Sequence, residues 1–131
     1  PWRKTIRGRL AEIIVLDQFS RNSYRNDPRA YDGDAIAVTL AQEAVVMEEK
    51  VTLSSQERSF LYMPFMHSES LIVQEKQSMV YFKEPGLEKR YRYAQEHYQT
   101  IKKFGRFPYR NKVLGRKSTQ QELIYLKKTM A

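Results

Sequence analysis

The chain has 131 residues, of which 41% are hydrophobic and 29% charged, and its formal net charge is +8. This length and balance are typical of one globular domain with its own core, and no apolar run is long enough to span a membrane. The absence of cysteine excludes disulfides and thiolate metal sites and fits a cytoplasmic location. A basic excess of this size attracts anionic small molecules or polyanions, although it can also serve solubility alone.

The first helix is predicted over about residues 7–21, where apolar side chains cover nearly the whole circumference, as in a buried helix. The chain starts at Pro1 within residues that read like the interior of a protein. We therefore expect a native chain that is longer at this end, with residues 1–131 as a single helical domain. Turn residues mark a loop over 22–33, and a second helix follows over about 34–49.

Caps and breaks define the middle of the chain. Ser54 and Glu57 fit a capping box at the start of a third helix, which Pro64 should kink or end. A fourth helix is predicted over about 67–83, before the turn signal at residues 85–86.

The last third of the chain shows two more helices. One covers about 87–104 and ends at Gly105, and Thr119 and Glu122 fit a second capping box that begins the other. Apolar and polar residues never alternate persistently, so no strand is predicted, and no repeat of fixed period is visible. We therefore predict an all-α fold built of antiparallel helix pairs.

A carboxylate interrupts the apolar face of the first helix. Asp17 lies in the middle of that face, and Arg21 follows one turn later. Because a buried carboxylate needs a cation or hydrogen-bond donors, a salt bridge between the two is the simplest interpretation. Gln18, Asn22 and Arg25 extend the polar run, which favours the floor of a polar pocket. In that interpretation, Arg21, Asn22 and Arg25 bind a ligand.

The two histidines are the second candidate feature. His67 precedes Glu69 and shares a face of the predicted fourth helix with Gln74, whereas His97 is either a core histidine or a pocket wall. In the pocket interpretation, Gln74 and His97 bind the ligand. A histidine near a carboxylate suits proton transfer at neutral pH, although His67 can also be structural. With so few ligands no metal site is predicted. No phosphate-binding glycine loop or dinucleotide motif is present, so no cofactor is predicted.

The stretch KKFGRFPYRNKVLGRKST, residues 102–119, has seven basic residues, three aromatic rings and no acid. Its phenylalanines are expected to anchor a rigid loop that leads into the N-terminus of the last helix, which favours an anion. Guanidinium groups and an amide in such a loop suit a carboxylate or phosphate. This assigns ligand binding to Arg106, Arg110, Asn111 and Arg116. In the alternative interpretation, the arginines pair with Asp17, Glu69 and helix carboxyl ends, and the loop only locks the fold.

Three long stretches of the chain resemble the bacterial family called domain of unknown function 924. They are LAEIIVLDQFSRNSYR at 10–25, ERSFLYMPFMHSESLIVQE at 57–75 and HYQTIKKFGRFPYRNKVLGRKSTQQE at 97–122. The resemblance implies a tetratricopeptide-like helical array and an N-terminal part that precedes Pro1, but no activity. All candidate residues named above match the family's motifs. Tyr109 stands where the family usually has histidine, which weakens any mechanism that needs a histidine there.

These observations lead to one expectation and two alternatives. We expect Asp17, Arg21, His67, Glu69, Arg106, Arg110 and Asn111 to converge in a pocket that binds a small anionic ligand. His67, Glu69 and Asp17 are the candidates for acid–base chemistry there. The alternatives are a helical scaffold that binds a peptide or protein, and a protein that binds nucleic acid through its basic face. The pattern indicates no membrane partner and no particular oligomeric state.

Overall fold

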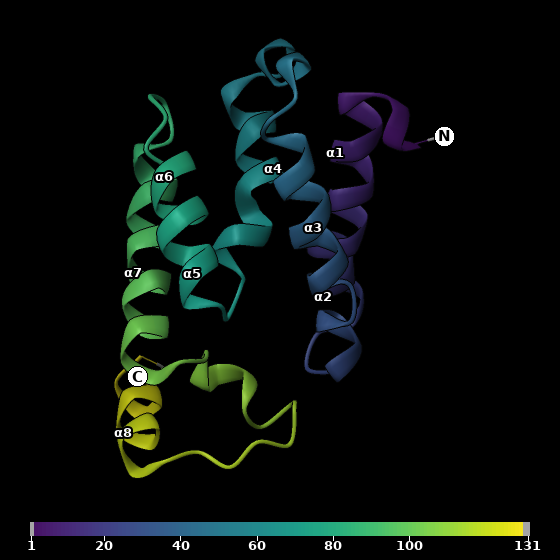
Figure 1. The fold of residues 1–131 in the computed structure, drawn as a ribbon. Helices are drawn as coiled ribbons and strands as arrows, with labels where there is room; N and C mark the ends of the chain where they lie inside the picture. Colours follow the sequence, from purple (N-terminus) through teal and green to yellow (C-terminus); the bar gives the residue numbers. More distant parts are fainter. Residues whose placement is uncertain (1, 130–131) are drawn as a thin grey trace.

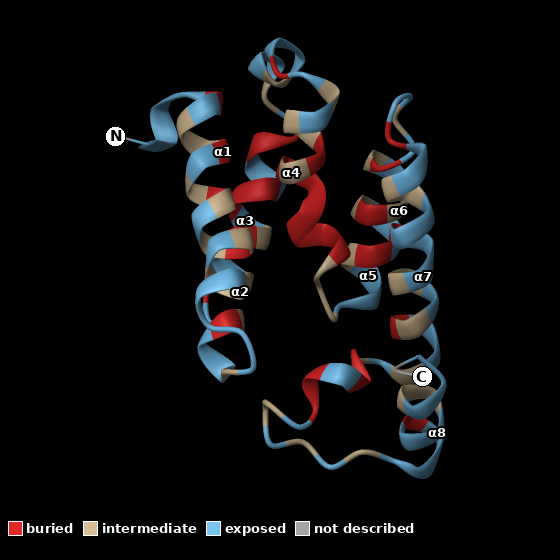
Figure 2. Cartoon of the chain, turned by 180° about the vertical axis from the view of Figure 1, so that it is seen from behind, coloured by how far each residue is buried: buried red, intermediate tan, exposed pale blue. Residues whose placement is uncertain are grey.

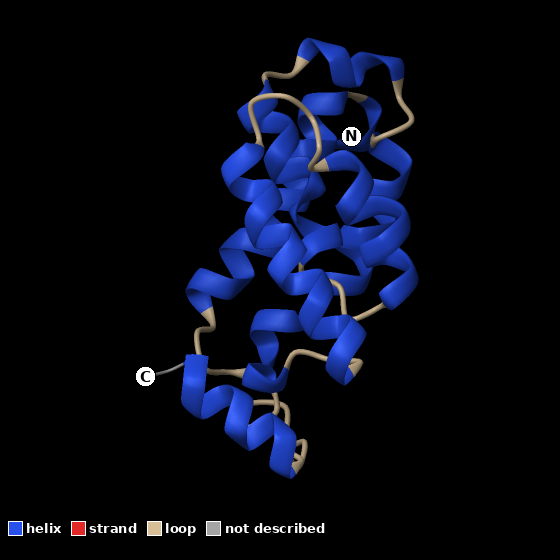
Figure 3. Ribbon diagram, turned by 90° about the vertical axis from the view of Figure 1, so that its left-hand side faces the viewer, coloured by secondary structure: helices blue, strands red, loops and turns tan. Residues whose placement is uncertain are grey.

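The computed structural model describes residues 2–129, so Pro1 and residues 130–131 lie outside it. The described residues are helical and contain no strand, which confirms the all-α prediction (Figure 3). None of their helices is both long and apolar enough to cross a bilayer. The α-helices are α1 (Ile6–Ile14), α2 (Ser20–Ser23), α3 (Asp34–Ala44), α4 (Ser55–Met66), α5 (Leu71–Val73), α6 (Met79–Tyr81), α7 (Glu88–Phe104) and α8 (Gln120–Thr129).

Shorter elements join or interrupt these helices. Two are π-helical turns: η2 (Val15–Phe19) joins α1 to α2, and η5 (Gln74–Ser78) joins α5 to α6. Each pair therefore forms one continuous helix with a widened middle turn. The others are 3-10 turns: η1 (Trp2–Lys4), η3 (Pro28–Tyr31), η4 (Glu48–Thr52) and η6 (Pro108–Arg110).

The helix α4 runs through the centre of the molecule. Its capping box is formed as predicted, with the Ser54 hydroxyl accepting from the Glu57 amide at 3.1 Å and the Glu57 carboxylate accepting from the Ser54 amide at 2.8 Å. Pro64 lies inside α4 and does not end it. Every residue from Leu61 to Met66 is buried (Figure 2), and this packing outweighs the hydrogen bond that the proline cannot donate.

Two predicted helix boundaries are wrong. The second helix ends at Ala44 rather than near residue 49, because the chain turns at the extended Met47 and returns Leu53 to the core. The fourth begins at Leu71 rather than His67, because the Ser70 hydroxyl caps it by accepting from the Val73 amide at 3.3 Å. Residues 67–70 are therefore a loop.

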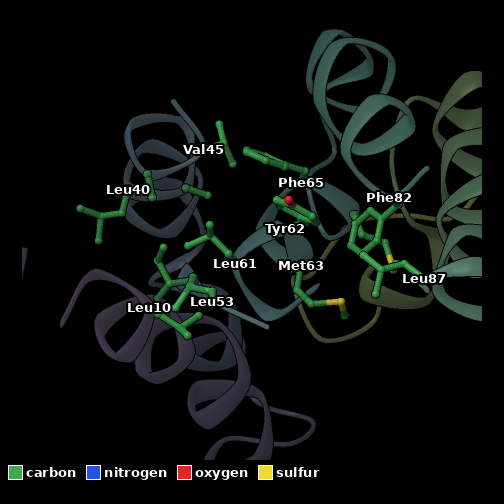
Figure 4. Packing of buried hydrophobic residues seen from close by; sticks show 14 of the residues in the cluster. Leu10, Leu40, Val45, Leu53, Leu61, Tyr62, Met63, Phe65, Phe82 and Leu87 are labelled. Carbon is green, nitrogen blue, oxygen red and sulfur yellow. The ribbon is translucent and has the colours of Figure 1, made fainter. Parts of the chain in front are cut away.

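The hydrophobic core lies on both sides of α4 (Figure 4). On one side Leu61 meets Leu10 of α1 and Leu40 of α3 within this cluster. On the other side Tyr62 packs edge-on against Phe82, with ring centroids 5.7 Å apart. At the lower end of the molecule in Figure 1, residues 105–118 pass below α5 toward the end of α2.

Candidate functional site

The side chain of Asp17 joins several segments of the chain. It lies on the widened turn η2, and only 1% of its surface is exposed. Its Oδ1 accepts from His67 Nδ1 at 2.7 Å and from Arg21 Nη1 at 3.1 Å, and its Oδ2 accepts from Gln18 Nε2 at 2.8 Å. Burial alone raises the pKa of Asp17, but His67 and Arg21 outweigh it and hold the pKa below its usual value. The side chain of Asp17 is therefore ionised at pH 7.

His67 faces the other way into a hollow of about 280 Å³. Its Nδ1 is engaged by Asp17, and its backbone oxygen accepts from Arg110 Nη2 at 2.7 Å. Burial, aided by the charges of Arg21 and Arg110, lowers the pKa of His67 despite Asp17. The ring is therefore neutral at pH 7, with its proton on Nδ1 and its lone pair on Nε2. The hollow is lined by Arg21, Arg25, Asn26, Ala30, Tyr31, His67, His97 and Tyr109.

Two arginines beside the hollow are neutralised within the protein. Arg21 binds Asp34 through two parallel hydrogen bonds of 2.8 and 3.0 Å. Arg110 is 3% exposed, lies over the rings of Tyr31 and Phe107 at 4.6 and 4.7 Å, and has its Nη1 3.7 Å from Asp34. The two positive charges of these arginines are therefore balanced by the two negative charges of Asp17 and Asp34.

Arg25 differs from these arginines. Its side chain is exposed at the hollow, and no carboxylate within the described residues pairs with it. Arg25 is therefore the guanidinium that is open to an incoming anion. Asn22, which the sequence also assigns to ligand binding, is exposed on α2 and does not line the hollow.

His97 forms a second imidazole wall. Its ring centroid is 6.4 Å from that of His67, and its Nδ1 lies 2.8 Å from the backbone oxygen of Tyr93. Burial lowers the pKa of His97, so this ring is also neutral at pH 7. Its Nδ1–H donates to Tyr93, and the lone pair lies on Nε2. Of the two interpretations of His97 from the sequence, the structure favours a pocket wall.

Gln74 holds the loop that carries His67. It lies on the second widened turn, η5, and is fully buried. Its Nε2 donates to the backbone oxygens of Met66 at 2.9 Å and Ser68 at 2.8 Å. Gln74 does not line the hollow, and its amide nitrogen fixes the backbone of this loop. Asp17 and Gln74 both lie on π turns, which occur often at functional sites.

Glu69 belongs to a separate network. Its carboxylate accepts two hydrogen bonds from Arg116, at 2.9 and 3.1 Å, and one from the Phe107 amide at 2.6 Å. Asn111 accepts from Arg116 Nε at 3.0 Å and donates to Ser118 at 3.0 Å. These contacts oppose the predicted acid–base role of Glu69 and the predicted ligand contacts of Arg116 and Asn111. The three side chains instead lock residues 105–118 to the loop after α4.

Arg106 does not join the site. It binds Glu122 of α8 through two hydrogen bonds of 2.9 and 2.8 Å and donates to the Lys117 backbone oxygen at 2.7 Å. Arg106 does not line the hollow beside His67. The alternative interpretation expected Asp17, Glu69 or a helix carboxyl end as its partner, whereas Glu122 lies at the start of α8. The predicted capping box is formed, with Glu122 accepting from the Thr119 amide at 2.8 Å.

Sequence reasoning missed several residues of the site. Tyr31 and Asn26 come from a loop that carries only turn signals, and Asp34 reads as an ordinary acid at a helix start. Tyr109 was visible only as a departure from the family pattern. In residues 2–129 no three histidine, aspartate or glutamate side chains come together as metal ligands.

Comparisons with known proteins agree with the fold. No curated protein matches the chain. A solved structure of a protein of unknown function from Agrobacterium tumefaciens is 34% identical and superimposes with a TM-score of 0.88 over 97% of this chain and 71% of that one. The profile of the bacterial proteins of unknown function, DUF924, matches residues 1–130. The chain therefore belongs to the DUF924 family.

Proposed function

We propose that the chain binds a small anionic molecule in the hollow beside His67, and that His67 acts there as a general base. One observation carries this proposal. The 2.7 Å hydrogen bond between His67 Nδ1 and the buried Asp17 carboxylate fixes a ring that lines the hollow, and no hydrogen bond within the described residues engages its Nε2.

The chemistry follows from this arrangement. A neutral imidazole with its lone pair on Nε2 takes a proton from a bound molecule or from water. Asp17 orients the ring and stabilises the imidazolium that forms. Because the pKa of His67 is lowered by burial, the ring is unprotonated and ready at neutral pH.

The charge of the ligand follows from Arg25. The other cations at the hollow, Arg21 and Arg110, already face Asp17 and Asp34. Arg25 is exposed, and a carboxylate or phosphate at its guanidinium gains charge-assisted hydrogen bonds.

Binding is tested by titrating acetate and inorganic phosphate into the ¹⁵N-labelled protein. We expect the amide signals around His67 and Tyr31 to shift. In Arg25→Gln the affinity for either anion should fall by about tenfold or more. Arg29→Gln is the matched control, because Arg29 is exposed on the same loop but binds Asp27 at 2.9 Å. Equal losses in both variants, or no shifts near His67, would overturn the proposal.

The general-base role is tested by the ¹⁵N shifts of the His67 ring. We expect the neutral Nδ1–H form at pH 7, and loss of that preference in Asp17→Asn. A ring that is an imidazolium at pH 7, or protonated on Nε2, would rule out proton abstraction by His67.

A further inference from the structure

A second hollow adjoins the first. It measures about 100 Å³ and lies between α7, the start of η6 and α8. His97 and Tyr109 line both hollows, so these two side chains form the partition between them. The remaining lining residues of the smaller hollow are Glu96, Thr100, Phe107 and Tyr125.

The walls of this smaller hollow are mainly aromatic. Phe107 is 1% exposed, and its ring centroid lies 5.3 Å from His97 and 5.6 Å from Tyr109. The hydroxyl of Thr100 donates to the backbone oxygen of Glu96 at 3.0 Å and lies 3.3 Å from the Tyr125 hydroxyl. Ring faces and edges remain for a ligand, and these favour apolar or aromatic groups.

The charges of the two hollows differ. The larger one holds Arg25, whereas among residues 2–129 the only charged side chain that lines the smaller one is that of Glu96. An anionic group is therefore favoured at Arg25 and disfavoured beside Glu96. One molecule that fills both hollows has its negative charge at one end and an uncharged part at the other.

The partition between the hollows includes a movable ring. Tyr109 is 47% exposed and makes no side-chain hydrogen bond in the described part of the chain, so its rotation breaks none. Its ring is tilted by 31° against that of Phe107, and it makes no hydrogen bond to the buried network of Asp17 and Arg21. A ligand can therefore pass this ring without breaking an ion pair.

We propose that the ligand is an anion with a short apolar or aromatic arm, whose charged group lies at Arg25 and whose arm lies between Phe107, Tyr109 and Tyr125. This inference rests on the proposed function, because it extends the same site. It names the substrate class as small alkyl or aryl carboxylates or phosphates.

The test is a titration series of acetate, butyrate, hexanoate and 3-phenylpropionate followed by amide NMR. Each buried methylene should tighten binding about fourfold. The longer ligands should shift the amides of Thr100 and Tyr125 in the unmodified protein, and acetate should not. Thr100→Phe fills the smaller hollow, so it should remove the gain from the arm and leave acetate binding unchanged. Gln99→Phe, on the exposed side of the same helix, is the matched control.

The outcomes separate this inference from the proposed function. Equal affinity for all four carboxylates, with loss of binding in Arg25→Gln, would overturn the arm and keep the anion site. Stronger binding of 4-aminobutyrate than of butyrate would show that Glu96 selects a cationic arm, which contradicts the inference. No binding of any carboxylate or of phenyl phosphate would overturn both.

Discussion

The Asp17 carboxylate holds together groups that lie 50 residues apart in the chain. Its two oxygens accept from His67, Arg21 and Gln18, so the loop after α4 is tied to the first helix through one buried side chain. Removing the charge leaves Arg21 with Asp34 alone and leaves His67 without an ionic partner. The residue therefore has a structural and an electrostatic effect at once.

Asp17→Asn should lower the free energy of unfolding by about 3 kcal/mol, because breaking a buried ion pair exposes the cost of the remaining charge. Urea denaturation measures this change. Asp27→Asn is the control: Asp27 is a surface partner of Arg29, and asparagine caps η3 equally well, so a change below about 0.5 kcal/mol is expected. Similar losses in both variants would show that Asp17 has no special role.

Stability should fall when the pH drops below about 6.5, the usual pKa of histidine. The pKa values of His67 and His97 are lowered in the folded protein, so the unfolded chain binds protons there first. Their contribution is complete above pH 6.5 and is lost as the pH falls toward the folded values. The carboxyl groups with a lowered pKa, such as Asp17 and Glu69, change the stability only when the pH falls below their usual pKa values of 3.8 to 4.5.

This pH dependence is measured by urea denaturation between pH 7.5 and 5. A His67→Gln, His97→Gln double variant should show a flatter profile over that range. A wild-type protein that becomes more stable toward pH 5 would mean that Asp17 raises the pKa of His67, against the direction given above.

At the scale of elements, the start of α8 is held by one ion pair, and Tyr125 further along α8 packs on Phe104 with ring centroids 5.1 Å apart. Glu122 is its only buried residue among those described, and the hydrogen bonds from Arg106 lower the pKa of Glu122 to about 2. Glu122→Gln should therefore speed amide hydrogen exchange throughout α8 and leave the exchange of α4 unchanged. Since the pair is fully charged above the usual pKa of 4.5, the wild-type exchange pattern of α8 should not change between pH 6 and 8 apart from the intrinsic rate. Slow exchange in the variant would show that α8 is held by other contacts.

The elements also show what sequence reasoning can and cannot give. Both capping boxes and the stop at Gly105, whose φ is 75°, follow from local chemistry and were predictable. The π turns leave no mark in the apolar pattern of the sequence, so the inward position of Gln74 could not be predicted. The pairing of Arg106 with Glu122 depends on tertiary contacts that spacing alone does not encode. Pairing of a loop arginine with Glu69 was one of the alternatives from the sequence, and Arg116 is the arginine that makes it. Asp17 and His67 were identifiable because a polar residue on an apolar face demands a partner.

At the scale of the whole molecule, the positive charge is unevenly distributed. Residues 1–86 carry 11 Lys and Arg and 12 Asp and Glu, whereas residues 87–131 carry 12 Lys and Arg and three Glu. Because Arg106, Arg110 and Arg116 are turned inward onto protein partners, the outward charge of this part comes mainly from lysines. Lysines act as hydrated point charges rather than as shaped recognition groups.

We therefore expect weak binding to heparin that falls steeply between about 0.05 and 0.2 M salt. Lys102→Glu combined with Lys103→Glu should reduce retention on a heparin column, and His67→Gln should not. Retention that depends on His67 would instead place a polyanion in the hollow and revive the nucleic-acid interpretation.

The two widened turns have a consequence for relatives of different length. A π turn contains one residue more than an α turn, so loss of one residue at Val15–Phe19 or Gln74–Ser78 lets the helix return to regular pitch without a gap. The flanking segments then keep nearly their orientation, and the side chains within the turn are the ones that change direction. Asp17 lies within the first of these turns, so its carboxylate would lose its place between His67 and Arg21 while the helix itself survived. Single-residue gaps at these two places in an alignment would therefore mark proteins that keep the fold and have lost the site.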